Sequence, residues 1–295
     1  MNAISNLFGY LLNWLYQVFS NYGIAIIVFS VILRLILIPI TVKQQKTMKK
    51  SAKMQEKMRE IQNKYKNNPE KLNQETIELY KKEKMSPFSG CLSSILQIVI
   101  ILAVFYLVSK PLTYMKKIDQ DIIQGYITEI KEEYGTISAY SEIEVIQKKS
   151  AEDPDVYINM DFFGLDLSKV PNQNMGDFTV YIIPILYVIT SFISIKMTNN
   201  MQNNKKKEED VKLIVSGDRD KTDNAGKEKS EQDEALESMQ EMSKSMSYMM
   251  PIMSICIAFV APLGLALYWL VSNLLMIVER LIINKVMKEN EEEQL

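Results

Sequence analysis

The 295-residue chain contains no histidine and only two cysteines, Cys91 and Cys256. Without histidine, it has no imidazole for general-base catalysis, for a Ser-His-Asp triad or for the common histidine-containing zinc sites. Both cysteines lie in apolar stretches, so we expect neither a disulfide framework nor a cysteine-rich metal site. The phosphate-binding pattern G-x-x-x-x-G-K-[ST] is also absent. We therefore expect a protein that works without covalent chemistry and without a cofactor or metal.

Charged residues make up 24% of the chain, yet they are nearly missing from several long apolar runs. A helix that crosses a membrane needs about 20 apolar residues, because it rises about 1.5 Å per residue through roughly 30 Å of hydrocarbon. Residues 24–42 contain one charge, Arg34, and residues 91–108 and 178–195 contain none. These three runs predict membrane spans.

A fourth run, residues 248–278, is uncharged throughout and would form a helix of about 46 Å, which is longer than moderate tilt absorbs. Pro262-Leu263-Gly264 lies at its middle, where proline and glycine can turn the chain. We expect two short helices, at about 246–261 and 263–284, and the alternative is one kinked helix. The predicted fold class is an all-α polytopic membrane protein with five transmembrane helices.

Basic residues indicate the orientation, because they are retained on the cytoplasmic side of a membrane. Residues 43–90 carry 13 Lys and Arg against 6 acidic residues, whereas residues 109–178 carry 7 against 13. The first segment is therefore expected inside and the second outside. This places the N-terminus outside and the C-terminus in the cytoplasm.

The first 22 residues lack a basic start and an A-x-A-like cleavage site, so they do not resemble a cleavable signal peptide. Their apolar side chains recur at helical spacing, which predicts an amphipathic helix on the outer membrane interface. The members of this apolar face are Leu7, Tyr10, Leu11, Trp14, Leu15 and Val18.

The segments between the spans differ in character. Residues 43–90 predict a cytoplasmic helical hairpin, whose second helix starts with Asn68 as N-cap and Pro69 at the first position. The outer segment is acidic, with a helix expected from Asp119 to Tyr134. Residues 199–234 are polar, which predicts disorder.

The resulting division of the chain has ten parts. In order they are an outer amphipathic helix (1–22), the first span (23–42), the cytoplasmic hairpin (43–90), the second span (91–108), the extracellular loop (109–177), the third span (178–197), a partly disordered cytoplasmic loop (198–245), the fourth span (246–261), the fifth span (263–284) and a cytoplasmic acidic tail (285–295).

Arg34 lies within about one residue of the centre of the first span, where an arginine costs about 2.5 to 3.5 kcal/mol. We expect the spans to offer no acidic partner, so the hypothesis is a water-filled cavity around this charge. The alternative is an arginine that bonds helix-end carbonyls as a packing device. Polar side chains on other spans could line the cavity or could bond across packed helices. They are Ser30 and Thr41; Ser93, Ser94 and Gln97; Thr190, Ser191 and Ser194; and Trp269, Ser272, Asn273, Met276 and Arg280.

Together these residues resemble the YidC family of membrane protein insertases over most of the chain. The similarity includes Leu33-Arg34-Leu35 with Ile38-Pro39-Ile40-Thr41, Ser86-Pro87 with Gly90-Cys91-Leu92 and Gln97, Asp161-Phe162-Phe163-Gly164-Leu165-Asp166-Leu167, and Pro262-Leu263-Gly264-Leu265-Ala266-Leu267-Tyr268-Trp269 with Ser272-Asn273. The chain departs from the family pattern at Glu56 and Ser93, in a longer outer loop at 116–159, and in its acidic rather than basic C-terminal tail.

The resemblance implies a five-helix insertase core around a hydrophilic groove, in a bacterial cell membrane and of the Gram-positive type without the large outer domain. The implied and proposed groove residues are Arg34, Gln97, Trp269, Tyr268, Ser30, Ser94, Ser194 and Asn273. Nascent membrane proteins and lipid are the implied partners, with the secretion channel, signal recognition machinery and ribosome as further candidates and no sequence-specific nucleic acid. Two alternatives stay open, a small-solute or ion transporter that uses Arg34 and a scaffold that binds helices without inserting them.

Overall fold

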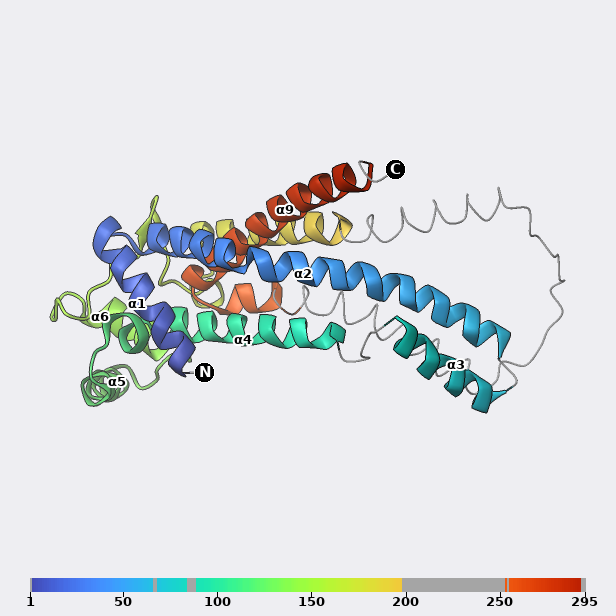
Figure 1. Cartoon of the computed structure of the whole chain (residues 1–295). Helices are drawn as coiled ribbons and strands as arrows, with labels where there is room; N and C mark the ends of the chain where they lie inside the picture. The colour runs from blue at the N-terminus through green and yellow to red at the C-terminus, as the bar shows by residue number, and fades with distance from the viewer. Residues whose placement is uncertain (1, 66–67, 84–88, 198–252, 254, 293–295) are drawn as a thin grey trace. The chain divides into compact units, whose positions relative to one another are not determined.

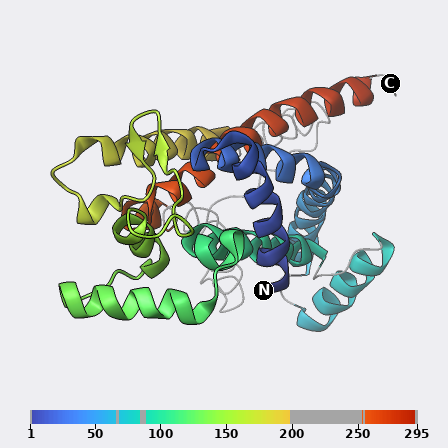
Figure 2. The same cartoon turned by 90° about the vertical axis from the view of Figure 1, so that its left-hand side faces the viewer.

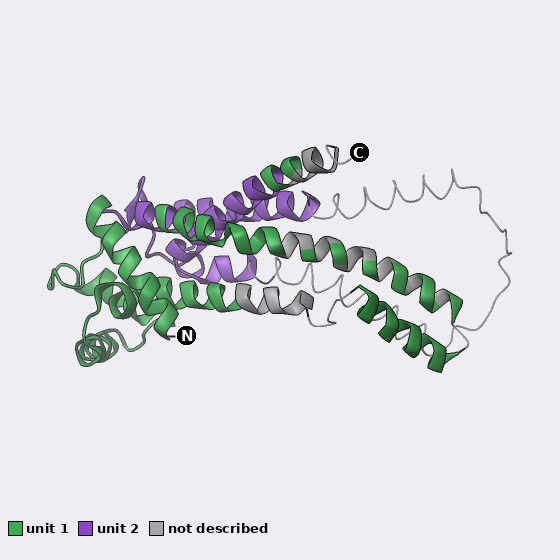
Figure 3. Cartoon of the chain, viewed as in Figure 1, with its two compact units in different colours: residues 1–20, 28–158, 282–295 green, residues 21–27, 159–281 purple. Residues whose placement is uncertain are grey.

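The computed structural model describes the chain except for residues 1, 66–67, 84–88, 198–252, 254 and 293–295 (Figure 1). The predicted cytoplasmic loop and most of the predicted fourth span therefore lie outside the described residues. The described residues are mostly helical and divide into two units (Figure 3). Unit 1 comprises residues 1–20, 28–158 and 282–295, and unit 2 comprises residues 21–27 and 159–281.

Helix α1 (Asn2–Phe19) packs in unit 1 on α4 (Ser89–Ser109) and on η1, a π-helical turn at Leu112–Lys116 (Figure 2). The Ser5 hydroxyl donates a hydrogen bond to the carbonyl oxygen of Ala103 at 3.1 Å. The buried side of α1 consists of Ser5, Gly9, Leu12 and Leu15. A second, exposed stripe consists of Leu7, Tyr10, Trp14 and Val18. The predicted helix is confirmed, but its apolar face is split, because Leu15 packs inward while four other members stay exposed.

Helix α2 (Tyr22–Lys64) continues from the first predicted span into the first arm of the hairpin, so residues 42 and 43 do not mark a structural break. Asn21 caps its start, with the side-chain oxygen accepting a hydrogen bond from the Ile24 backbone at 3.1 Å. Pro39 lies inside the helix, where one backbone donor is missing. The Lys, Gln and Met residues that follow are good helix formers, so the helix continues to Lys64.

Helix α3 (Pro69–Lys82) is the second arm of the hairpin, and its predicted start is confirmed. The Asn68 side-chain oxygen accepts a hydrogen bond from the Lys71 backbone at 3.1 Å, with Pro69 at the first helical position. Lys57 of α2 pairs with Glu83 just after α3 at 2.5 Å, and this contact lowers the pKa of the Glu83 carboxyl. Polar contacts thus join the two arms.

The segment between the second and third spans contains more regular structure than the single helix predicted from its sequence. The expected helix is confirmed as α5 (Gln120–Tyr134), with Asp119 as its N-cap, and a further helix, α6 (Ser141–Lys149), packs against it. Lys149 is buried and binds Glu129 at 2.5 Å and Glu152 at 2.9 Å. A paired buried charge of this kind joins α5 to the end of α6.

Unit 2 contains a feature that the predicted all-α fold does not include, a two-stranded antiparallel hairpin of β1 (Asp161–Phe162) and β2 (Leu165–Asp166). The strands pair Asp161 with Asp166 and Phe162 with Leu165. Two 3₁₀ turns follow, η2 (Pro171–Gln173) and η3 (Phe178–Tyr181). A helix over residues 182–197 then forms the rest of the third span.

The long apolar run is broken where the sequence predicts. Residues 255–260 are helical, residues 261–262 are not, and α9 (Leu263–Glu292) begins at the predicted residue. Within the described residues this break favours two helices over one kinked helix, and α9 extends beyond the predicted end at residue 284.

Three of the described helices are long and apolar enough to cross a membrane, at Tyr22–Lys43, Phe178–Met197 and Leu263–Ile283. Within α4, residues Ile98–Ser109 form a shorter apolar helix. The structure therefore confirms the all-α polytopic membrane class, with the small β hairpin as an addition.

Candidate functional site

Ser30 and Arg34 lie on one side of α2, because residues four apart share a helix face. Ser30 is only 3% exposed and Arg34 is half-buried, just past the midpoint of the span Tyr22–Lys43. The neighbouring Leu35 and Ile36 are exposed, as expected of lipid-facing side chains. A charge at this depth is stable only against protein or water, and the partial burial of Arg34 meets that requirement.

Ser94 and Gln97 belong to α4 by their backbone. Their side chains lie outside the described part of the structure, so their place in a groove stays a prediction. They and the Ser30–Arg34 face belong to unit 1, whereas Ser194, Tyr268, Trp269 and Asn273 belong to unit 2.

In unit 2, polar side chains of the helix over 182–197 meet polar side chains of α9. The Asn273 amide donates hydrogen bonds to the hydroxyls of Thr190 and Ser191, each at 3.2 Å. The Arg280 guanidinium donates to the Ser194 hydroxyl at 3.5 Å. We call these five residues the polar ladder.

The ring of Trp269 continues the line of the polar ladder against Tyr187, with 6.1 Å between the ring centres and 34° between the planes. The residue numbers of the paired side chains increase in the same order along both helices, so the two helices run in parallel. Trp269 is half-buried and Tyr268 is buried beside it. Four of the predicted groove residues thus lie in or next to one helix–helix contact.

For Ser194 and Asn273, the observed bonds are interhelical packing bonds, the alternative to a role in lining a groove. Both side chains are less than a tenth exposed. Bonds of this kind hold membrane helices in register, because an unpaired polar group in hydrocarbon is costly.

Replacing Asn273 by alanine should destabilise the protein by about 1 kcal/mol, within the range of interhelical hydrogen bonds in membranes. The reason is the loss of both bonds to Thr190 and Ser191. Thermal unfolding of the purified protein measures the effect. A double-mutant cycle with Ser191→Ala should give a favourable coupling energy between the two side chains. A coupling energy of zero would contradict the polar ladder.

One charged residue of the last span was missed in the sequence analysis. Glu279 lies within Leu263–Ile283 and is 8% exposed, so the expectation of spans without an acidic side chain is wrong. The rule that flags Arg34 also applies here, because ionisable residues inside a span are rare and point to function. Glu279 should therefore have been a candidate from the sequence.

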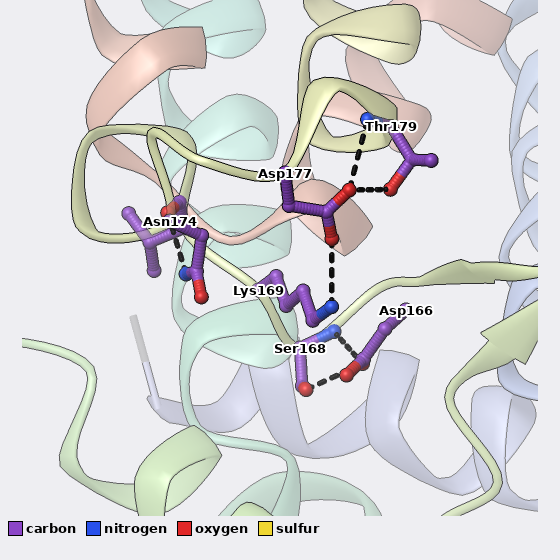
Figure 4. A network of polar contacts seen from close by, with 7 residues as sticks. Asp166, Ser168, Lys169, Asn174, Asp177 and Thr179 are labelled. Atoms are coloured by element: carbon purple, nitrogen blue, oxygen red, sulfur yellow. Dashed lines mark hydrogen bonds and ion pairs between the residues drawn. The ribbon is translucent and has the colours of Figure 1, made fainter.

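The segment 159–179 of unit 2, here called the collar, contains a network of short polar contacts (Figure 4). Lys169 binds one carboxylate oxygen of Asp177 at 2.8 Å, and the Thr179 hydroxyl and backbone donate to the other oxygen at 2.6 and 3.0 Å. These donors lower the pKa of Asp177 to about 2, chiefly through the bond from Lys169. The hydroxyl and backbone of Ser168 donate to Asp166 in the same way.

The collar also binds the starts of two membrane helices through backbone hydrogen bonds. The first backbone donors of α9, at Leu263 and Gly264, reach the carbonyl oxygens of Lys169 and Leu167, each at 2.9 Å. The backbone donor of Tyr22 at the start of α2 reaches Asn159 at 2.9 Å. Because helix starts leave four donors without internal partners, these bonds satisfy groups that would otherwise be costly near the membrane.

The collar makes the stability of the folded protein depend on pH. The folded state holds the pKa of Asp177 below its ordinary value of 3.8, so its contribution is complete above about pH 4 and is lost as the pH falls toward 2. Asp177→Asn should therefore lower the melting temperature at pH 6 to 7, and the difference from the parent protein should shrink between pH 4 and 2. A difference that stays constant over that range would contradict this account.

The features above define a class, that of polytopic α-helical membrane proteins with charged and polar side chains inside their spans. Residues 14–291 match the model of the family described as 60Kd inner membrane protein. The chain belongs to this family, and the resemblance to YidC proteins seen in the sequence is confirmed.

Three similar proteins bear the name Membrane protein insertase YidC. The one from Treponema denticola is 26% identical over 274 residues, which cover 93% of this chain and 36% of that protein. The one from Fusobacterium nucleatum is 26% identical over 284 residues, with 96% of each covered. The one from Caldanaerobacter subterraneus is 27% identical over 282 residues, with 96% and 94% covered. The chain thus spans about a third of the first relative and nearly all of the other two.

Proposed function

We propose that this chain is a membrane protein insertase that moves short hydrophilic tails of client proteins across the membrane through a hydrophilic groove and releases their apolar segments into lipid. The observation that carries the proposal is Arg34, a half-buried charge at mid-depth of a membrane span. Membership of the 60Kd inner membrane protein family and the names of its relatives support the same role.

The physical problem is the passage of polar groups through hydrocarbon. Each unsatisfied backbone or side-chain polar group costs several kcal/mol in the bilayer core. A groove that admits water to the depth of Arg34 shortens the dry path. The positive charge then attracts the acidic residues of a tail, while the apolar segment that follows is free to move sideways into lipid.

In this proposal Arg34 supplies the charge, and Ser30, Ser94 and Gln97 supply polar wall on α2 and α4. In unit 2, the half-buried Trp269, with the buried Tyr268 next to it in sequence, offers an aromatic surface to the client. Ser194 and Asn273 keep the third and fifth spans in register through the polar ladder. No step makes or breaks a covalent bond.

The proposed setting is the bacterial cell membrane, with the N-terminus outside and the C-terminus in the cytoplasm. Nascent membrane proteins and membrane lipid are the proposed partners. The secretion channel, the signal recognition machinery and the ribosome are further proposed partners.

Purified protein in liposomes tests the proposal directly. A single-span client with a short acidic tail should reach a protease-protected, membrane-inserted state faster than in empty liposomes of the same lipid. Equal rates would contradict the insertase. Flux of a small solute or ion without any gain in insertion would instead favour the transporter alternative.

A further inference from the structure

The turn of the β hairpin has an unusual composition for its conformation. Phe163 and Gly164 join β1 to β2, and both have positive φ angles, of 51° and 81°. A two-residue hairpin turn with two positive φ angles favours Asn or Gly at the first position. A bulky aromatic residue pays an unfavourable conformational free energy there.

Contacts within the chain stabilise the ring of Phe163 only weakly. Its side chain is 88% exposed. It touches the neighbouring Phe162 edge-on, with 4.8 Å between the ring centres, and a Cβ added at Gly164 would meet no atom within 4 Å. Strained residues persist where the surroundings or a function require them, and the surroundings here are open.

The hairpin lies at the level where membrane helices begin. The Asn21 amide, next to the start of α2, donates to the Asp161 carbonyl at 2.7 Å. On the other side of the hairpin, Leu167 accepts from Gly264 at the start of α9. Phe178 begins the third span and is itself 85% exposed. These hydrogen bonds hold the hairpin beside the starts of α2 and α9.

We propose that Phe163 inserts into the interfacial layer of the leaflet at which these spans begin, the predicted outer leaflet, and anchors the collar to lipid. Trp and Tyr are enriched at this depth. Phe is among the residues that bury the apolar face of interfacial helices at the boundary between headgroups and acyl chains. Lipid is the partner because the hairpin is bonded to the starts of two membrane helices, where an exposed apolar ring meets the bilayer before it meets another protein. The proposal does not depend on insertase activity.

A spin label measures the depth of this side chain. Phe163→Cys is labelled in full-length protein in which Cys91 and Cys256 are replaced by serine, and the protein is placed in phosphatidylcholine–phosphatidylglycerol bilayers. Asp155→Cys, at an exposed polar residue that also precedes the third span, is the matched control. The ratio of collision with oxygen to collision with a water-soluble nickel chelate should be several-fold higher at position 163 than at position 155.

A second probe keeps the test decisive if the labelled protein does not fold. The emission spectrum of Phe163→Trp minus that of the parent protein, which has two tryptophans, isolates the new residue. This difference spectrum should be blue-shifted, and it should be quenched by lipid brominated near the headgroup rather than by aqueous iodide. The same difference spectrum for Asp155→Trp should respond to iodide.

Three outcomes would overturn the proposal. Equal nickel access at positions 163 and 155 would place the ring in water. If the label at position 163 is shielded from the nickel chelate only when a client is added, the ring binds the client and not lipid. Protection that rises with the protein-to-lipid ratio would assign it to a second copy of the chain.

Discussion

Replacing Arg34 by alanine should slow the insertion of clients with acidic tails about tenfold, whereas clients with neutral tails should lose much less. A tenfold change corresponds to about 1.4 kcal/mol. This is a modest share of the attraction between unit charges about 4 Å apart at an effective dielectric constant of about 20. The measurement is the initial rate of insertion into proteoliposomes for a pair of clients that differ only in tail charge.

The matched control is Arg34→Lys, which keeps the positive charge and should keep most of the rate for acidic tails. Arg34→Gln keeps hydrogen-bonding capacity without charge and should behave like the alanine variant. Melting temperatures of all three show whether the fold is intact. Equal losses for acidic and neutral tails would rule out an electrostatic role.

Replacing Gly9 by alanine should have the largest effect on the fold, with a loss of about 3 kcal/mol or more and detachment of α1 from its site. A Cβ at this position would lie 1.8 Å from the carbonyl oxygen of Tyr114, and a backbone atom cannot move aside as a flexible side chain can. Thermal unfolding measures the loss of stability. Protease access to α1 in the folded protein measures its detachment.

Gly125→Ala provides the control, because Gly125 lies inside α5 and an added Cβ there meets no atom within 4 Å. Alanine is the better helix former, so this variant should be as stable as the parent or more stable by up to about 1 kcal/mol. Equal destabilisation by the two substitutions would show that the close contact of α1 with η1 is not formed.

Much of the fold could be predicted because a membrane protein places apolar residues in lipid and charged residues in water. Gaps in charge located the spans, Asn68 with Pro69 located the start of α3, and Pro262 located the break before α9. The continuity of α2 across residue 42 was not foreseen, because hydropathy marks where a helix leaves the membrane and not where it ends. The collar was also missed, since its bonds join residues far apart in the sequence, such as Lys169 and Leu263.

The candidate site divides in the same way. Arg34 could be found because depth in the membrane makes any charge informative, and the same rule should have found Glu279. The partners of Asn273 could not be found, because the register between two helices depends on packing that periodicity does not encode. The sequence placed Thr190, Ser191 and Asn273 on polar faces, and only the structure shows that they bond to one another.

Site-specific photocrosslinking to a stalled nascent client tests the groove most directly. A photoreactive amino acid is placed at position 34, or at position 36 as a control, since Ile36 is exposed on the same helix as a lipid-facing side chain would be. The account predicts that the hydrophilic tail of the client crosslinks to position 34 and not to position 36. No crosslink at position 34, or equal crosslinks at both positions, would contradict it.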